Sequence, residues 1–199
     1  MPGAVMQNYL NHIYKTFAMN EITLFLMKCV YLMLPAYFAN MAPVIVKRVN
    51  FLAYPVDFNR KQGDKPIFGK NKTFRGLFFG VLFAVIISYL QFVGYKTEFL
   101  RSVSFFGYGN WLVFGFLMGV GALAGDLVKS FFKRRAGINP GGKFIPFDQS
   151  DFVIGASIFI MPVFALTWKI FLTSLVLSFV LDILVNHAAF YLKIRNEKW

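Results

Sequence analysis

Apolar runs separated by polar segments alternate along the whole chain. A helix needs about 20 mostly apolar residues to cross the hydrocarbon of a bilayer, and most of these runs approach that length. The pattern predicts an all-α integral membrane protein with about five transmembrane helices. Their expected bounds are 22–46, 77–93, 110–124, 152–166 and 170–191.

The last two expected spans come from one apolar run over residues 152–191, which is too long for a single crossing. Thr167, Trp168 and Lys169 near its middle predict the turn of a hairpin. Trp168 is then expected at the membrane interface, where tryptophan is enriched.

Several residues inside the spans have more than one interpretation. Pro35 removes a backbone donor and predicts a kink in the first span. Lys28 either reaches the interface along its own side chain or lies on a transport pathway. Asp182 and His187 are expected to face the bundle interior or water. The glycines of the third span either let a neighbouring helix approach closely or leave room for a ligand beside Asp126.

Three parts are expected along the chain. Residues 1–21 form an N-terminal extension, which is either an interfacial helix or the frayed start of the first span, and which lacks the pattern of a signal peptide. Residues 22–192 form a single multi-span membrane domain, and residues 193–199 form a cytoplasmic tail.

The composition excludes an ordinary soluble domain, because 57% of the residues are apolar, only 15% are charged and the mean hydropathy is +0.57. The net charge is +12, which in a soluble protein would suggest nucleic acid. Here the cations lie between apolar runs, so anionic headgroups or a phosphorylated substrate are the expected partners, and nucleic acid is not. The single cysteine, Cys29, lies in an apolar run and is expected to serve packing.

The cations are distributed unequally between the two sides of the expected bundle. Sixteen Lys and Arg residues lie in segments 47–75 and 129–151 and in the tail, against four on the other side. The positive-inside rule therefore places the N-terminus outside and both basic loops in the cytoplasm, where nucleotides are found.

Charged residues are most concentrated between residues 125 and 151. Three carboxylates, Asp126, Asp148 and Asp151, lie among five Lys and Arg residues. Carboxylates suit Mg²⁺, and Lys and Arg suit phosphates, so the segment predicts metal-assisted phosphoryl or nucleotidyl transfer. If Asp148 and Asp151 open a helix they share a face. The alternative is that these carboxylates only cap helices.

The other basic loop contains Lys70, Lys72, Thr73 and Arg75 just before the second span. Such residues at the start of a helix could surround phosphate oxygens. The loop is not a Walker A motif, because the required Gly and Lys spacing is absent. The alternative is a loop that only determines topology.

At these residues the chain resembles a known family. Residues 125–135, Gly-Asp-Leu-Val-Lys-Ser-Phe-Phe-Lys-Arg-Arg, and residues 146–152, Pro-Phe-Asp-Gln-Ser-Asp-Phe, are similar to the signature of the CDP-archaeol synthases. These are membrane relatives of the phosphatidate cytidylyltransferases, and residues 70–76 are similar to an upstream element of that wider family. Gln149, where the wider signature has Arg, favours the archaeol branch.

The resemblance, which covers residues 22–192, implies a Mg²⁺-dependent nucleotidyltransferase of phospholipid biosynthesis. Its reaction transfers CMP from CTP to 2,3-bis-O-geranylgeranylglycerol 1-phosphate and releases pyrophosphate. The enzyme is expected in the cell membrane with its active site on the cytoplasmic face. The expected metal ligands are Asp126, Asp148 and Asp151, which form the catalytic set with Lys133 and Arg134. The other substrate-binding residues are Lys70, Lys72, Thr73, Arg75, Lys129, Ser130 and Arg135.

Two other functions stay open at this point. One is a phosphatidate cytidylyltransferase acting on a diacyl lipid, and the other is a multi-span transporter. A transporter would carry ionisable residues at the midplane of several spans, whereas here only Asp182 is expected to lie deep. The sequence leaves four points open: the chemistry of the lipid chains, the preference for CTP or dCTP, the number of metal ions, and whether the protein is a monomer or a homo-oligomer.

Overall fold

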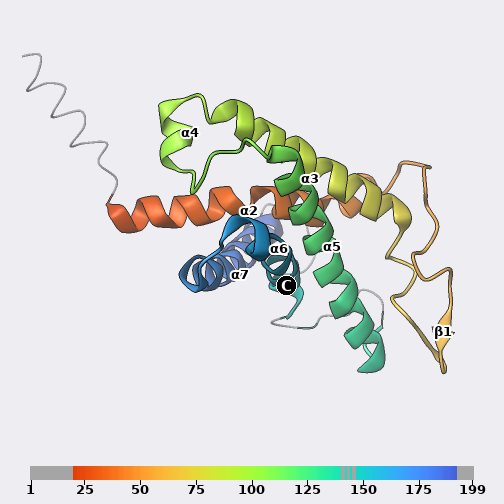
Figure 1. The fold of residues 1–199 in the computed structure, drawn as a ribbon. Helices are drawn as coiled ribbons and strands as arrows, with labels where there is room; N and C mark the ends of the chain where they lie inside the picture. The colour runs from red at the N-terminus through yellow and green to blue at the C-terminus, as the bar shows by residue number, and fades with distance from the viewer. Residues whose placement is uncertain (1–19, 140–141, 143, 145–146, 192–199) are drawn as a thin grey trace, which may run out of the picture.

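Apolar helices form most of the described chain, which in the computed structural model comprises residues 20–139, 142, 144 and 147–191. The expected all-α class is confirmed (Figure 1). The long helices are α2 (Glu21–Ile45), α3 (Phe74–Gly94), α5 (Trp111–Arg135) and α7 (Trp168–Tyr191). The shorter elements are strands β1 (Lys61–Gln62) and β2 (Lys65–Pro66), helices α4 (Glu98–Ser102) and α6 (Asp151–Phe164), and the 3-10 helix η1 (Phe147–Gln149).

Four helices are long and apolar enough to cross a membrane, namely α2, α3, α5 and the Trp168–His187 part of α7. Helix α6 is also apolar but has only 14 residues. At 1.5 Å per residue it extends about 21 Å, whereas the hydrocarbon core is about 30 Å thick. The expected number of apolar helices is therefore found, but the fourth is too short to cross on its own.

The outer faces of the long helices are apolar, and several polar side chains lie inside. Ile86, Phe116 and Val176 are exposed, whereas Ser88 and Gln91 are buried. The Ser88 hydroxyl donates a hydrogen bond to the Trp111 carbonyl, and the Gln91 amide donates one to the Tyr31 carbonyl. Buried polar groups with internal partners and an apolar exterior are what a hydrocarbon solvent requires.

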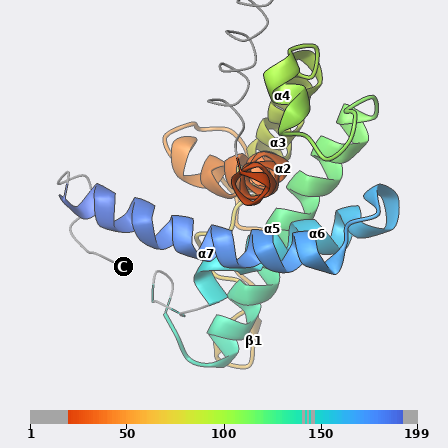
Figure 2. The same ribbon diagram turned by 90° about the vertical axis from the view of Figure 1, so that its left-hand side faces the viewer.

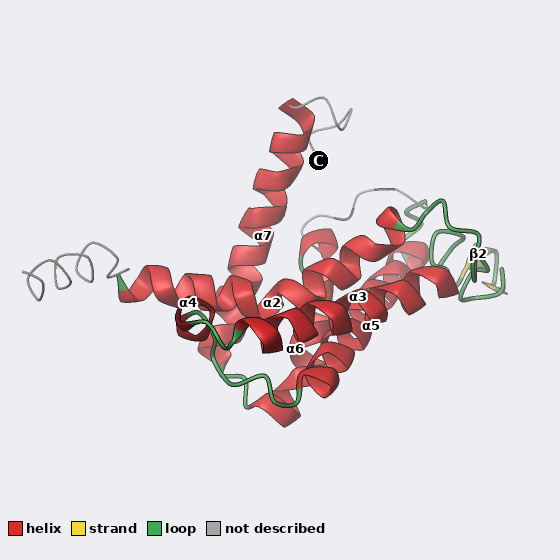
Figure 3. Ribbon diagram, turned by 90° about the horizontal axis from the view of Figure 1, so that it is seen from above, coloured by secondary structure: helices red, strands yellow, loops and turns green. Residues whose placement is uncertain are grey.

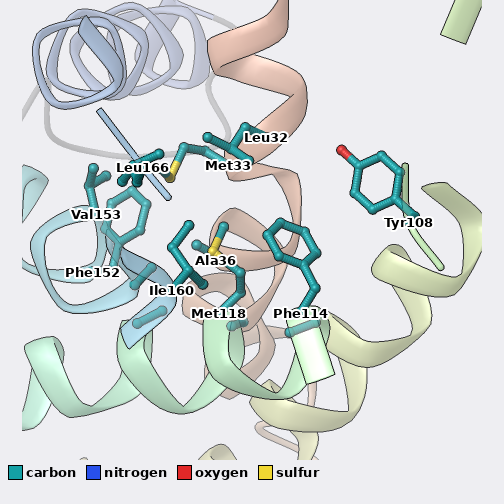
Figure 4. Close-up of a cluster of buried hydrophobic side chains, with 14 residues drawn as sticks. Leu32, Met33, Ala36, Tyr108, Phe114, Met118, Phe152, Val153, Ile160 and Leu166 are labelled. Carbon is teal, nitrogen blue, oxygen red and sulfur yellow. The ribbon is translucent and has the colours of Figure 1, made fainter. Parts of the chain in front are cut away.

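Helix α5 lies at the centre of the bundle, between α3 and α6, and it also contacts α2. Side chains from three helices meet in its core, including Met33 and Ala36 of α2, Met118 of α5 and Ile160 of α6 (Figure 4). Phe114 of α5 is fully buried in the same cluster. This packing fixes the helix that carries most of the candidate site.

Glycines allow α5 to approach both neighbours at backbone distance. A Cβ added to Gly121 would lie 2.6 Å from the carbonyl oxygen of Gly155 in α6. A Cβ on Gly115 would lie 2.8 Å from the Cα of Val85 in α3. At Gly125 an added Cβ would overlap the carbonyl oxygen of Asp151. Helix packing is thus one use of the glycines of the third span.

Helix α7 is joined to the bundle mainly through α2. The hydroxyl groups of Tyr37 in α2 and Ser178 in α7 lie 2.6 Å apart. Figures 2 and 3 show α7 projecting away from the other helices. The expected hairpin turn is shifted, because residues 165–167 are non-helical and Trp168 already begins α7.

The third helix is longer than the hydrophobic pattern predicts. The expected span ended at residue 124 and a loop was expected from residue 129, but α5 continues to Arg135. Lys and Arg are good helix formers, and cations are favourable in the last turn of a helix. Pro35 lies inside α2 without ending it. Most of the expected N-terminal extension and all of the tail fall outside the described residues.

Candidate active site

The last three turns of α5 carry six of the predicted site residues, and four of these lie on one face. Asp126, Ser130 and Lys133 are buried, and Lys129 lies among them with a side chain that is 13% exposed. Residues three, four and seven apart share one face of a helix. Because α5 is helical here, these side chains face the start of α6 and the segment before α3.

The ammonium group of Lys129 contacts all three predicted metal ligands. Its Nζ lies 3.1 Å from Asp126 Oδ1, 3.3 Å from Asp148 Oδ1 and 2.8 Å from Asp151 Oδ2. The three carboxylates come from α5, η1 and the first residue of α6. Asp148 and Asp151 therefore share a site, as expected, but they do not share one helix.

Two further lysines complete this cluster of charges. Lys72, from the segment before α3, places its Nζ 2.5 Å from Asp126 Oδ2. Lys133 donates to both oxygens of Asp148, at 2.9 and 3.1 Å. We call these three lysines and the three carboxylates the charge cluster. It holds as many ammonium groups as carboxylates, so its formal charge is zero.

Asp148 is held in its charged form. Burial alone would raise its pKa, but the hydrogen bonds from Lys133 and from the backbone N–H of Phe144, together with the charge of Lys129, outweigh burial and lower it. Asp148 is therefore ionised at neutral pH and available as an anionic ligand.

Arg134 has a different environment from the lysines. It is 5% exposed, and its Nε and Nη1 atoms have no hydrogen-bond partner among the described residues. A buried guanidinium group without partners is costly. The oxygens of a bound phosphate would satisfy it.

The remaining predicted residues are held in local structure. The Thr73 hydroxyl accepts a hydrogen bond from the Gly76 N–H and caps α3. Arg75 donates to the Val49 carbonyl, and Lys70 is exposed. Of these four predicted residues, the structure brings Lys72 into the charge cluster, whereas Thr73 and Arg75 bond to backbone groups and Lys70 is exposed.

Arg135 connects the two basic segments. Its guanidinium donates to the carbonyl oxygens of Gln62, Lys65 and Pro66, at 2.7 to 3.1 Å. In return, Lys65 Nζ donates to the Arg135 carbonyl at 2.9 Å. Figure 1 shows the hairpin beside the C-terminal end of α5. The two segments predicted to form one site therefore lie together.

Asp57 is an organising residue that sequence reasoning missed. Its carboxylate is buried and accepts hydrogen bonds from the N–H groups of Asn59, Phe68 and Gly69, at 2.9 to 3.0 Å. Burial raises its pKa, but these hydrogen bonds outweigh burial and lower it. The Asp-Phe-Asn sequence is a signal for such a turn, because Asp bonds to the backbone two residues on.

An apolar cavity of about 480 Å³ lies next to the charge cluster, between α5 and α6. Lys129 and Asp151 line it on one side, so it reaches the charges directly. Val128, Phe132 and Ile158 also line it and are each more than half exposed, so it is continuous with the outer surface. The other lining residues are Ala124, Gly125, Phe144, Phe147, Ile154, Gly155 and Phe159.

The three carboxylates are the right kind of ligand for a divalent cation, but in this structure they are not spaced closely enough to hold one. Three anionic oxygen donors converge on one position, and Asp151 Oδ1 is buried without a hydrogen-bond partner in the described chain. Hard cations such as Mg²⁺ prefer such oxygens. Yet no three Asp, Glu, His or Cys side chains of the described residues are grouped closely enough to hold a metal ion. The position between them is filled by Lys129.

Comparison with known proteins identifies the family. The CarS-like CDP-archaeol synthase family matches residues 22–199. The chain belongs to this family. A CDP-archaeol synthase of Saccharolobus islandicus is 34% identical over 168 residues, which cover 83% of this chain and 92% of that protein. One of Pyrococcus abyssi is 35% identical over 170 residues, covering 83% and 94%.

The structure agrees with this membership. A solved structure described as an intramembrane enzyme for archaeal membrane lipid biosynthesis has a TM-score of 0.64 and 30% identity. The match covers 79% of this chain and 91% of the solved one. A CDP-archaeol synthase of Thermococcus onnurineus is 42% identical over 131 residues, or 65% of this chain and 71% of that protein. The family resemblance inferred from residues 125–152 is confirmed.

Proposed function

We propose that this chain is a membrane cytidylyltransferase that transfers CMP from CTP to a lipid phosphate. Family membership favours this function over a transporter or a diacyl-specific relative. The lipid is 2,3-bis-O-geranylgeranylglycerol 1-phosphate, and the products are the CDP-archaeol precursor and pyrophosphate. The observation that carries the proposal is the charge cluster beside an apolar cavity, since Lys129 and Asp151 belong to both.

The reaction is an in-line phosphoryl displacement. An oxygen of the lipid phosphate attacks the α-phosphorus of CTP, a new P–O bond forms, and the bond to the β-phosphate oxygen breaks. Pyrophosphate leaves with the bonding electron pair. No residue has to remove a proton, because a phosphomonoester with a second pKa of about 6 is largely dianionic near pH 7.

The side chains of this chain position and neutralise the anionic substrates. Arg134, whose buried guanidinium has free donors, and Lys133 would hold the triphosphate and the leaving pyrophosphate. Lys72 and Lys129 would meet the lipid phosphate at the mouth of the cavity. Asp126, Asp148 and Asp151 would hold Mg²⁺, which when bound would neutralise charge on the phosphate oxygens.

The apolar cavity would receive the start of the prenyl chains. Apart from Lys129 and Asp151, its wall is apolar and largely aromatic or aliphatic. The lipid headgroup would then lie at the charges while its chains remain in the bilayer.

We place the site on the cytoplasmic side of the cell membrane. The support is the excess of Lys and Arg in the two basic segments, which the contacts of Arg135 join at one end of the bundle. CTP is available on that side. A homo-oligomer remains compatible with this arrangement.

The function can be tested with the purified full chain in vesicles. We expect labelled CTP and Mg²⁺ to give a CDP-lipid, identified by mass, only when a lipid phosphate is added. In a panel of lipid phosphates, isoprenoid ethers should react faster than acyl esters. Absence of a CDP-lipid with every member of the panel would refute the proposed function. Faster reaction of acyl esters would refute the proposal that the lipid substrate is an isoprenoid ether.

The carboxylates give a second test. Asp148→Asn and Asp151→Asn should lower turnover by orders of magnitude, because a neutral amide is a poor ligand for Mg²⁺. If these residues only cap helices, both changes should be nearly silent, since Asn and Asp cap equally well. Asp64→Asn, an exposed loop carboxylate, is the matched control and should keep full activity. Near-normal activity of both site variants would remove the metal assignment.

A further inference from the structure

The position expected for a divalent cation is filled by a side chain of the protein. Lys129 Nζ is within 3.3 Å of an oxygen from each of Asp126, Asp148 and Asp151. Its side chain is 13% exposed, and the Asp151 side chain is 5% exposed, so the contacts lie away from bulk solvent. They are less weakened by water and salt than contacts on a surface.

The ammonium group and a divalent ion make incompatible demands on the same oxygens. Mg²⁺ requires oxygens at about 2.0–2.1 Å in octahedral geometry, whereas Nζ to oxygen distances here are 2.8 to 3.3 Å. The three carboxylates must therefore move inwards to hold a metal ion. They cannot do so while Nζ lies between them.

The charges lead to the same conclusion. In the charge cluster, three carboxylates are matched by Lys72, Lys129 and Lys133. With a formal charge of zero, the cluster has little net attraction for a dication. If Lys129 leaves, the remaining groups carry one net negative charge, and the freed ammonium can pair with a phosphate.

We propose that Lys129 is an internal counter-ion that occupies the cation site before catalysis and is exchanged for the metal ion. Its ammonium holds the three carboxylates together in the resting protein. On metal binding, Lys129 would leave the site and turn to the lipid phosphate at the mouth of the adjacent cavity, which it already lines. Lys129 thus lowers the affinity for free metal and couples metal binding to the arrival of phosphates.

This inference rests on the proposed function, because it takes the three carboxylates as the metal site. It makes a prediction that a phosphate-binding role alone does not make. Removing a substrate-binding lysine should weaken CTP binding and leave the affinity for free Mg²⁺ unchanged. Removing a competing lysine should increase the affinity for free Mg²⁺.

The test compares purified full-length wild type with Lys129→Met, without CTP or lipid. Thermal unfolding is followed by tryptophan fluorescence during titration with MgCl₂, and binding is measured by calorimetry. Without metal we expect a lower Tm for Lys129→Met, because three buried carboxylates lose their shared cation. We expect half-saturation by Mg²⁺ at a concentration at least about tenfold lower than in wild type, or about 1.4 kcal/mol.

Lys133→Met is the matched control. It lies one turn further along α5 and contacts only Asp148 of the three carboxylates. Its removal should change the affinity for Mg²⁺ much less than removal of Lys129. An unchanged or lower affinity of Lys129→Met for Mg²⁺ would overturn the proposal, and so would an equal gain in both variants.

A measurement on the wild type covers the case in which Lys129→Met does not fold. Amine-selective labelling, with each site quantified by mass spectrometry, should show Lys129 becoming more reactive as MgCl₂ is added. Lys61, which is exposed on the hairpin, should not change. Unchanged labelling of Lys129 at saturating Mg²⁺ would overturn the proposal that the metal ion replaces Lys129 in the cation site. CDP-lipid synthesis would persist in that case, which separates this failure from failure of the proposed function.

Discussion

Arg134 and Arg135 are adjacent in sequence, yet they have opposite surroundings. Arg134 is buried with free donors, whereas Arg135 donates to three loop carbonyls. Adjacent residues on a helix point in different directions, about 100° apart. At the residue scale, neighbouring cations can therefore have different roles, here Arg134 facing the site and Arg135 holding the hairpin.

Arg134→Ala should weaken the use of CTP without loosening the loops. Loss of a charge-assisted contact costs about 1.5–3 kcal/mol, or a factor of roughly 10 to 150 in kcat/KM at about 1.4 kcal/mol per decade. Arg135→Ala is the control and should instead increase hydrogen exchange in β1 and β2. Steady-state kinetics and exchange mass spectrometry measure the two effects. The assignments would be contradicted if Arg134→Ala increased hydrogen exchange in β1 and β2 while Arg135→Ala lowered kcat/KM for CTP.

Asp57→Ala should disorder the basic loop, because three backbone N–H groups lose their acceptor. The pKa of Asp57 is lowered in the folded state. Its stabilising effect is therefore fully present above the unfolded pKa of about 3.9 and is lost as pH falls through the folded pKa. Proteolysis of the loop as a function of pH should show this loss in wild type and not in Asp57→Ala. Equal pH profiles of wild type and Asp57→Ala would contradict the stabilising role of the Asp57 carboxylate.

The residues of the charge cluster were predictable because side-chain chemistry marks them in sequence. Asp126, Lys133 and Asp148 belong to a pattern of carboxylates and cations that suits phosphate chemistry. The sequence signals only the local turn between Asp57 and Asn59. The bonds of Asp57 to Phe68 and Gly69 and those of Arg135 to the hairpin were not predictable, because the partners are backbone groups distant in sequence. Every residue has an N–H or a carbonyl, so such contacts leave no pattern of paired residue types.

At the element scale, the sequence predicted where apolar segments lie better than where helices end. Hydrophobicity changes at Asp126, but α5 continues to Arg135 because its hydrogen bonds do not depend on side-chain polarity. The continuous apolar run also gave no indication that α6 is short. The helix ends because Ala165 adopts a left-handed backbone conformation, with φ 46°. The helix propensity of Lys and Arg extends α5, and the local backbone conformation at Ala165 ends α6, so neither end coincides with a change in hydrophobicity.

Gly125→Ala should lower turnover by more than its effect on stability explains. The new Cβ would overlap the Asp151 carbonyl and push α6 away from α5, which would separate Asp151 from Asp126 and Lys129. Overpacking of this kind typically costs about 1–3 kcal/mol. Thermal unfolding and kcat are measured in parallel.

Gly115→Ala is the matched control for this change. Its Cβ would press on α3 at 2.8 Å from Val85 Cα, far along α5 from the carboxylates. We expect a similar fall in Tm with kcat largely retained. If both variants lose turnover to the same degree, the contact at Gly125 has no special effect on the site.

At the scale of the whole molecule, contacts between the basic segments reduce the possible topologies. Lys72 with Asp126, and Arg135 with the hairpin, place residues 60–75 and 126–135 on one side. The distribution of cations then selects the cytoplasm for that side. The structure contributes the pairing of the segments, and the sequence contributes the direction.

Single-cysteine labelling in a Cys29→Ser background tests this orientation. Lys61→Cys should react with an impermeant maleimide only after cells are opened. Lys96→Cys, which is exposed at the opposite end of α3, should react in intact cells. Reaction of Lys61→Cys in intact cells would show that the orientation is inverted.

The ion pair between Asp126 and Lys129 bears on how the protein is made. Both residues lie on α5 within one turn, and Nζ is 3.1 Å from Oδ1. Asp and Lys each cost about 2.5–3.5 kcal/mol at the centre of an inserting helix. A nascent α5 carries both partners of this pair, so it can be inserted with the two charges neutralised within one helix, before α6 and its Asp151 are in place. The helix that holds most of the site can thus be inserted early and wait for α6 to complete it.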